Sequence, residues 1–326
     1  MCKYYVTGVA GMIGSTVARQ LLQAGNEVIG LDNFWRGREE NLVDLKVFDN
    51  FSFRYADLAT DSSWSEDLVE SDRIIHIADI VAGIGYVFNN EWEIFSQNNK
   101  INNMVAAVIR EKKPEKVVYL GTACSYPQSM QKSVTDSVLC ETDKYPAEPE
   151  SGYGWSKLIG EIELRLAVKD ERTNLIVLDL HNVYGYPCIY KEETSQVIPA
   201  LIWKALSSKN GSPLDIWGDG SQGRAFVHVT DVANAVVLAT QYLGEYDCFM
   251  IGPTTCTTIK AVAELVCEHP DIMISDITFD LTKPVGDIGR YADNTLARNE
   301  LGWSPLIEIR EGIFDLIDSI KKSEDQ

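Results

Sequence analysis

The sequence lacks any long apolar run. No stretch approaches the roughly 18 consecutive apolar residues that a membrane-spanning helix needs, and the chain starts without a basic segment followed by an apolar one. We therefore expect a cytoplasmic protein with no membrane partner. The sequence also has no internal repeat and no low-complexity linker, so we treat it as a globular chain throughout.

Basic residues are few. The chain has 29 Lys and Arg against 48 Asp and Glu, a formal net charge of -19. Because this charge repels phosphate backbones and no basic run offsets it, we expect no nucleic-acid partner. A small phosphate-bearing molecule is compatible with the same charge, since a few arginines and helix N-termini can make a pocket locally positive.

The cysteines show no metal-binding or disulfide pattern. The seven cysteines are scattered, odd in number and without any Cys-x-x-Cys, so neither a disulfide framework nor a zinc site is indicated, and we expect no metal. With 326 residues and 45% hydrophobic content, the chain can bury a large core. This size predicts one large domain or two closely joined domains.

What the sequence does contain is a tyrosine followed by a lysine. Of its fourteen tyrosines, only Tyr153 has a lysine four residues on, Lys157. In the amphipathic helix predicted from about residue 153 to 169, this spacing puts both side chains on one face. A nearby positive charge favours phenolate and lowers the pKa of a tyrosine from about 10. The pair predicts acid-base chemistry, and the alternative is a core tyrosine beside a solvent-exposed lysine.

A glycine turn near the N-terminus predicts a dinucleotide site. Gly8, Gly11 and Gly14 lie between a predicted strand at 4–7 and a predicted helix at 15–24. Their spacing permits a tight turn, and it lets a pyrophosphate approach the start of the helix. The next strand, 27–31, is followed by Asp32, which can accept hydrogen bonds from ribose hydroxyls and would repel a 2′-phosphate. These features predict NAD rather than NADP, and the candidate cofactor-binding residues are Gly8, Gly11, Met12, Ile13, Gly14, Asp32, Asn33, Asp57, Leu58, Ala78, Tyr153 and Lys157.

Strands and helices alternate through the first half of the chain. Further strands are predicted at 51–55, 73–77, 116–120 and 174–180, with a long helix at 92–112. This order predicts an α/β fold with a Rossmann-type, doubly wound parallel sheet. Ligands bind at the carboxyl ends of the strands in such sheets, and the loops that follow the strands here carry the polar residues.

The motifs together resemble the extended short-chain dehydrogenase/reductases, the NAD-dependent epimerases and dehydratases of nucleotide sugars. The resemblance rests on the glycine turn, Asp32, Thr122, Tyr153-x-x-x-Lys157 and the run from His181 to Gly185. It implies an enzyme in which NAD removes hydride from a sugar carbon, usually C4. Tyr153 would take the hydroxyl proton, Lys157 would hold the nicotinamide ribose and Thr122 would contact the substrate oxygen.

Within that superfamily, the chain is most similar to the GDP-mannose 3,5-epimerase family. The similar segments are 79–85, 123–127, 146–149, 217–220 with Arg224, and 289–290 with Asp293. The dehydratases carry an Asp-Glu pair after the threonine, whereas this chain has Ala123-Cys124. The resemblance implies a nucleotide-sugar epimerase acting through a transient 4-keto sugar, with a GDP-sugar favoured and Cys124 as an acid/base. A thiolate suits proton removal next to a ketone, and the alternative is a packing cysteine.

The second half of the chain loses the regular alternation. By the resemblance, residues 1–183 and 225–249 form the NAD-binding domain, and residues 184–224 and 250–326 form a smaller, interleaved substrate domain. Arg224 and Arg290 are candidates for the diphosphate, with Asn182 and Gly83 as further substrate contacts. The family typically forms homodimers through two helices per subunit, here about 92–112 and 153–169.

One residue of the epimerase pattern is missing. The lysine that faces the cysteine in that family aligns with Gln196 or Val197, and Lys191 lies several residues too early. We therefore predict proton exchange at a single carbon, or C4 oxidation without exchange. Two alternatives stay open at this point: a C4 dehydrogenase or 4,6-dehydratase of the same superfamily, and a dinucleotide-sensing regulator without chemistry.

Overall fold

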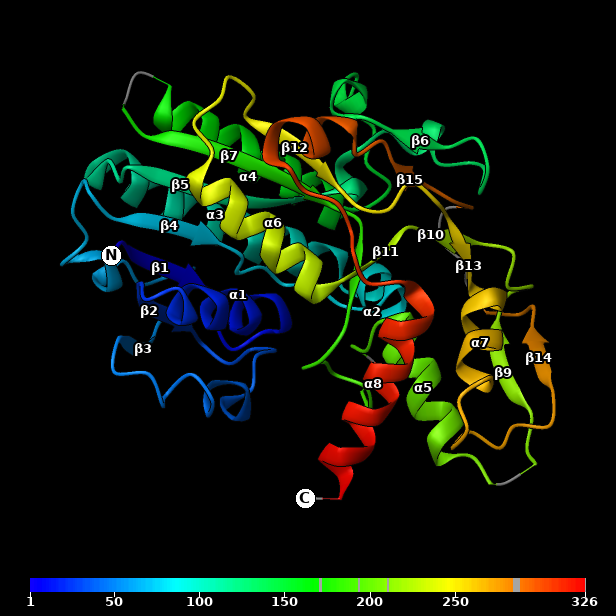
Figure 1. Ribbon diagram of the computed structural model, residues 1–326. Coiled ribbons are helices and arrows are strands. Elements are labelled where there is room, and N and C mark those ends of the chain that lie inside the picture. Colours follow the sequence, from blue (N-terminus) through cyan, green and yellow to red (C-terminus); the bar gives the residue numbers. More distant parts are fainter. Residues whose placement is uncertain (170–171, 193, 210, 284–287, 326) are drawn as a thin grey trace.

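A parallel sheet forms the centre of the protein. The computed structural model describes residues 1–169, 172–192, 194–209, 211–283 and 288–325. Within these residues, the largest sheet has seven strands in the order β12-β7-β5-β4-β1-β2-β3 (Figure 1), and each neighbouring pair is parallel. The strands are β1 (Lys3–Thr7), β2 (Glu27–Asp32), β3 (Phe51–Tyr55), β4 (Arg73–His76), β5 (Lys116–Thr122), β7 (Asn174–Leu180) and β12 (Cys248–Ile251). The predicted α/β fold with a parallel sheet is confirmed.

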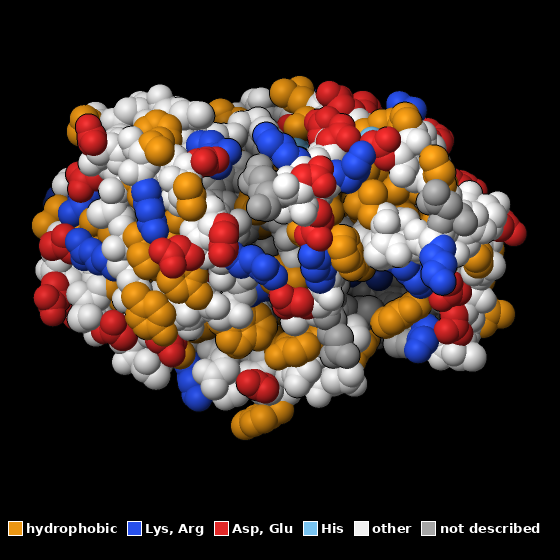
Figure 2. Space-filling view, turned by 90° about the horizontal axis from the view of Figure 1, so that it is seen from below, with side chains coloured by type: hydrophobic (Ala, Val, Ile, Leu, Met, Phe, Trp, Pro, Cys, Tyr) orange, Lys and Arg blue, Asp and Glu red, His pale blue; other side chains and the backbone are white. Residues whose placement is uncertain are grey.

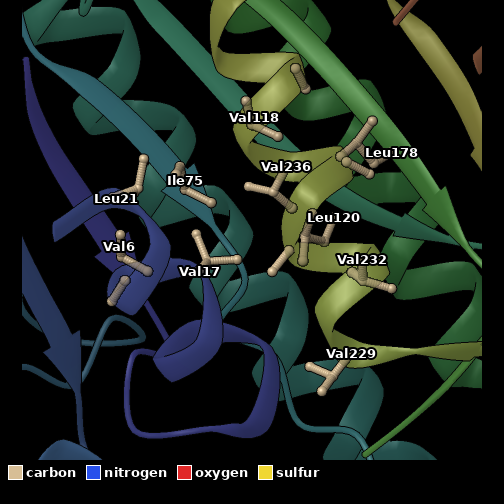
Figure 3. Packing of buried hydrophobic residues seen from close by; sticks show 14 of the residues in the cluster. Val6, Val17, Leu21, Ile75, Val118, Leu120, Leu178, Val229, Val232 and Val236 are labelled. Atoms are coloured by element: carbon tan, nitrogen blue, oxygen red, sulfur yellow. The ribbon is translucent and has the colours of Figure 1, made fainter. Parts of the chain in front are cut away.

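Two helices cover one face of the sheet. α1 (Met12–Gln23) and α6 (Val229–Gln241) pack against each other and against the strands. Figure 3 shows how their side chains, among them Val17 and Val236, meet Ile75 and Val118 of the sheet. The apolar residues at helical spacing on both helices thus form a buried layer against the sheet, as their sequence pattern predicts.

Two long helices cover the opposite face. α3 (Glu91–Lys112) packs along α4 (Gly152–Val168). Val105 and Ile109 of α3 and Leu164 of α4 belong to a second buried cluster with strand residues such as Val117. Because helices lie on both faces, the central strands are apolar on both sides, and all residues of β5 are buried.

The remaining elements gather beside the carboxyl ends of the strands (Figure 1). They include α2 (Ile84–Asn89), α5 (Val197–Ser207), α7 (Ile259–Cys267) and α8 (Ile309–Glu324). Short strand pairs join them: β8 (Asn182–Tyr184) with β11 (Phe226–His228), β9 (Leu214–Trp217) with β14 (Ile277–Asp280), β10 (Gly223–Arg224) with β13 (Thr257–Thr258), and β6 (Val138–Leu139) with β15 (Tyr291–Ala292). The division into two domains stays a prediction. Strand β12 carries the large sheet to Ile251, slightly past the boundary predicted at 249.

The connections create a crevice at one edge of the sheet. From β1 the chain moves outward to β2 and β3, and it then returns to place β4 on the other side of β1. Ligands of doubly wound sheets bind at such a reversal, outside the carboxyl ends of the strands. The crevice here therefore lies between the residues that follow β1 and those that follow β4.

The outer surface carries mixed charge. On the face drawn in Figure 2, Lys and Arg side chains are interspersed with Asp and Glu. Among the described helices, none is long and apolar enough to cross a bilayer.

Candidate active site

A large cleft opens at the strand reversal. Its volume is about 1770 Å³. Its lining includes every residue that the sequence predicted for cofactor, chemistry or substrate: Gly8, Gly11, Met12, Ile13, Gly14, Asp32, Asn33, Asp57, Leu58, Ala78, Gly83, Thr122, Cys124, Tyr153, Lys157, Asn182, Arg224 and Arg290. The structure thus brings these residues to one cleft, and the role of each stays a prediction.

The glycine turn leaves the N-terminus of α1 open to the cleft. Gly8 has a φ of +69°, and a Cβ on Gly14 would lie 2.1 Å from the Gly8 carbonyl oxygen. Side chains are therefore excluded at both positions for steric reasons. The N-cap of α1 is Gly11, which has no side chain to accept a hydrogen bond from the first turn. The exposed N–H groups and the helix dipole suit a phosphate group.

Asp32 links the glycine turn to the loop that follows β2. Its Oδ2 accepts a hydrogen bond from the Ala10 N–H at 2.9 Å, and its Oδ1 accepts one from the Phe34 N–H at 2.7 Å. Burial raises the pKa of this carboxyl, while its backbone hydrogen bonds oppose the shift. The carboxylate is thus held at the cleft wall in one orientation.

Thr122 and Tyr153 meet at the end of β5. The Thr122 hydroxyl oxygen accepts a hydrogen bond from the Cys124 N–H at 3.2 Å, which shapes the turn after the strand. A Cβ on Gly154 would lie 2.2 Å from the Cys124 carbonyl oxygen, so the start of α4 packs directly against this turn. Tyr153 is consequently close enough to form a hydrogen bond with the Thr122 side chain.

The environment of Tyr153 opposes its ionisation. Burial raises the pKa of the phenol above its ordinary value, and the negative charges of Cys124 and Asp79 add to the shift. The hydrogen bond with Thr122 and the positive charge of Arg36 act in the opposite direction. The surroundings of Tyr153 thus favour the neutral phenol over the phenolate.

Lys157 is paired with a buried carboxylate that the sequence analysis did not name as a site residue. Its Nζ forms an ion pair with Asp79, and only 4% of each side chain is exposed. The ammonium also lies 4.3 Å from the centre of the Tyr119 ring. The sequence suggested that Lys157 lowers the pKa of Tyr153, but here its charge is matched by a carboxylate, which weakens that effect. The other oxygen of Asp79, Oδ1, has no hydrogen-bond partner among the described residues.

Asp79 and Arg36 were not predicted as site residues. Asp79 lies three residues past the end of β4. A carboxylate so close to a buried strand was a usable signal, because charged side chains are rarely buried without a partner. Arg36 offered no comparable signal. It lies in the loop after β2, and its guanidinium donates hydrogen bonds to the carbonyl oxygens of Val81, at 2.5 Å, and Thr194, at 3.2 Å.

The two candidate diphosphate ligands have different surroundings. Arg224 is partly buried, and its Nη1 donates a hydrogen bond to the Gly223 carbonyl at 2.7 Å. Arg290 is 5% exposed, and its Nη2 donates a hydrogen bond to the Cys124 sulfur at 3.0 Å. The sequence therefore placed both arginines at the cleft, but it did not reveal that one of them contacts the candidate base.

Lys191 lines the same cleft as Cys124 and has an acidic partner. Its Nζ forms an ion pair with Glu324 of α8 at 2.6 Å and lies 4.6 Å from the centre of a Trp203 ring. About half of its side chain is exposed. Gln196 is the residue that precedes the first turn of α5. The absence of a lysine opposite Cys124 stays a prediction.

Comparisons with known proteins agree with this geometry. The family model described as "NAD dependent epimerase/dehydratase family" matches residues 4–252. The chain is 27% identical to GDP-mannose 3,5-epimerase 1 of Oryza sativa subsp. indica, covering 98% of this chain and 83% of the relative. It is 30% identical to UDP-glucose 4-epimerase of Mycolicibacterium smegmatis, covering 96% of each. The fold matches the crystal structure of a UDP-glucose 4-epimerase from Thermotoga maritima with a TM-score of 0.86, at 24% identity and 99% coverage of both chains. The chain therefore belongs to the NAD-dependent epimerase/dehydratase family, and NAD is its cofactor.

Proposed function

We propose that this enzyme is a nucleotide-sugar epimerase that works through a transient 4-keto sugar. The observation that carries the proposal is the convergence of Thr122, Tyr153, Lys157 and Cys124 on one cleft. The Thr122 hydroxyl can hold a sugar hydroxyl, and Tyr153 beside it can take the proton of that hydroxyl once the phenol has ionised to phenolate. A thiol close to the same point can then act on a neighbouring carbon.

The part of the cleft beside the glycine turn, Asp32 and Lys157 suits NAD. The glycine turn would hold the pyrophosphate, Asp32 the adenosine ribose, and Lys157 the ribose beside the nicotinamide. When bound, NAD accepts hydride from the sugar and can return it. Tyr153 takes the proton of the C4 hydroxyl during oxidation and gives it back during reduction.

Cys124 would act on the 4-keto sugar. The ketone makes protons on the adjacent carbons acidic, so a thiolate can remove one of them. Inversion needs a second proton donor, a residue or a water, on the opposite face of the ring. Because Gln196 and Val197 replace the lysine and Lys191 is paired with Glu324, we propose exchange at a single carbon.

Whether the hydride stays on NADH or returns to the sugar distinguishes this function from its alternatives. We would incubate the NAD-loaded protein with GDP-mannose, GDP-glucose and UDP-glucose, and follow NADH absorbance and product NMR together. An epimer without accumulated NADH supports the proposal. We favour the GDP-sugars because the sequence motifs resemble those of the GDP-mannose 3,5-epimerases. Stoichiometric NADH would identify a C4 dehydrogenase, and a 4-keto-6-deoxy product would identify a dehydratase. Failure to reduce bound NAD with all three sugars would count against the proposal and favour the regulator.

Asp32 is expected to determine cofactor choice. Its carboxylate would accept hydrogen bonds from the ribose hydroxyls of NAD and would repel the 2′-phosphate of NADP, so NAD should bind more tightly than NADP. Asp32→Ala should reduce this difference in affinity. Calorimetric titration with both cofactors measures this. Asp44→Ala is the matched control, because Asp44 is an exposed acid paired with Arg19. Equal affinities for the two cofactors in the wild-type protein would disprove this role.

The outer faces of α3 and α4 are expected to form a homodimer contact. Trp92, Trp155, Ile162 and Leu166 are all exposed large apolar residues on these helices, and the last three recur at helical spacing. A symmetric partner would bury this stripe. Light scattering at micromolar protein concentration should give a molar mass twice that of the chain. In Leu166→Glu the molar mass should fall to that of a single chain. Leu243→Glu is the control, since Leu243 is exposed outside these helices; a monomeric wild-type protein would contradict the prediction.

A further inference from the structure

The side chain of Arg36 spans the crevice at the edge of the sheet. Arg36 lies in the loop after β2, and its guanidinium reaches the segment after β4, where Nη1 donates a hydrogen bond to the Val81 carbonyl at 2.5 Å. Its Nη2 donates a second hydrogen bond to the Thr194 carbonyl, shortly before α5, at 3.2 Å. Arg36 and Val81 both line the cleft. One arginine thus joins three segments that are far apart in the sequence.

The backbone beside Arg36 packs directly on the glycine turn. The Arg38 N–H donates a hydrogen bond to the Ala10 carbonyl at 3.1 Å, and the Asn41 side chain donates another to the same oxygen at 2.7 Å. A Cβ on Gly37 would lie 2.7 Å from the Ala10 Cβ, so a side chain at Gly37 would clash with the turn. These contacts hold Arg36 next to the segment that leads into the N-terminus of α1.

The charge of Arg36 has no carboxylate partner. It forms no salt bridge with any described residue, and Glu192, whose charge also acts on it, is already paired with Arg38 at 2.7 Å. The other groups that act on it are Tyr153 and Cys188. Burial raises the pKa of both groups, which favours their neutral forms. Carbonyl oxygens satisfy N–H groups but do not cancel a charge, so a partly buried guanidinium of this kind indicates an anionic ligand.

The guanidinium has donors left for such a ligand. Arginine has five N–H groups, and the two carbonyls take one from each terminal nitrogen. The others can donate to phosphate oxygens, which match the planar fork of a guanidinium. The N-terminus of α1 supplies further N–H groups at the adjacent glycine turn. Together they offer both the charge and the donors that a diphosphate needs.

We propose that Arg36 is a ligand of the diphosphate of NAD, and that its side chain closes over the bound cofactor by keeping a contact with Val81 or Thr194. The inference requires only that the chain binds NAD, so it is independent of the proposed epimerase chemistry. The diphosphate supplies the negative charge that no described carboxylate provides. Arg224 and Arg290 keep their place as candidates for the diphosphate of the nucleotide sugar.

Nucleotide affinity tests this without turnover. The full chain is freed of bound nucleotide and titrated calorimetrically with NAD, ADP-ribose and adenosine. Arg36→Met should weaken binding of NAD and ADP-ribose, which both contain the diphosphate, by at least about tenfold. Adenosine, which has no phosphate, should bind unchanged. Arg36→Lys should recover part of the loss, because it keeps the charge but not the planar fork. Arg38→Met is the matched control and should bind all three like the wild type, since Arg38 is exposed and paired with Glu192.

Other phosphates could also bind at Arg36, and separate titrations distinguish them. A larger loss of affinity for NADP than for NAD in Arg36→Met would assign Arg36 to a 2′-phosphate and overturn the proposal. A loss for GDP or UDP as large as that for NAD would assign it to the nucleotide sugar, with the same consequence. Unchanged NAD affinity in a folded Arg36→Met, or an equal loss in Arg38→Met, would refute the proposal outright.

Two further readouts separate a charge contact from a structural role. If Arg36→Met does not fold, Arg36→Gln decides, because glutamine can still donate to a carbonyl but carries no charge, and it should also lose NAD affinity. The loss should shrink as NaCl is raised, since salt screens charges; a loss that is independent of salt would contradict the proposal. Stopped-flow fluorescence should show faster NADH release, and a loss confined to the association rate would contradict closure of the side chain over the cofactor.

Discussion

Replacing Tyr153 with phenylalanine is expected to slow hydride transfer by about 10²–10⁴-fold, the usual contribution of a positioned general base. Only the ionisable oxygen is lost, so nucleotide-sugar affinity should stay close to that of the wild type. Stopped-flow absorbance of NADH in a single turnover measures the rate, and calorimetry measures the affinity. A large loss of rate at constant affinity would assign the phenol to the reaction rather than to binding.

Tyr86→Phe is the matched control for this experiment. Tyr86 also lines the cleft, and its hydroxyl has no part in the proposed chemistry. Its variant should transfer hydride at nearly the wild-type rate. If Tyr153→Phe reduced bound NAD as fast as this control, the proton would have to leave through another group, and the proposed function would lose its central residue.

Replacing Asp79 with asparagine is expected to move the pH dependence of hydride transfer. Tyr153 accepts a proton, so the rate should rise with pH until the phenol is ionised. Burial raises the pKa of Tyr153 most, and the charges of Cys124 and Asp79 raise it further. Removing the Asp79 carboxylate and leaving Lys157 unmatched both favour phenolate. The profile should therefore move to lower pH by about one unit or more.

The pH profile is measured in single turnovers with saturating NAD. Breaking the buried pair should also lower the free energy of unfolding by about 3–5 kcal/mol, which chemical denaturation can verify. Asp57→Asn is the control, because Asp57 is a second carboxylate of the cleft that is not among the charges acting on Tyr153. An unmoved profile in Asp79→Asn, or an equal shift in Asp57→Asn, would show that Asp79 does not influence the base.

Local patterns predicted most of the large sheet. Strands β3 and β7 lie at 51–55 and 174–180 as predicted, β3 with alternating aromatic and polar residues and β7 with a largely apolar run. Helix α1 begins at Met12 rather than at Ser15. The glycine turn already directs the backbone into the helix there, and apolar spacing alone cannot show this. Strand β5 continues past Leu120 to Thr122, since its last residues still pair with β7.

The charge arrangement of the site could not be predicted in the same way. The Lys157–Asp79 pair and the Arg290–Cys124 contact join segments that only the folded chain brings together. Arg290 reaches the cleft because β15 pairs with β6, and each of these strands has only two residues. Strands that short leave no periodic pattern in a sequence. Residue types and motifs therefore predicted which residues line the cleft. The contacts between their charged groups could not be predicted from the sequence.

The most direct measurement of the central claim locates deuterium in the product. The enzyme, NAD and the nucleotide sugar that turns over are incubated in deuterated water, and the product is examined by NMR. We predict label at a single carbon adjacent to C4, and its loss in Cys124→Ala. Label at both C3 and C5, or full exchange retained by Cys124→Ala, would contradict the account.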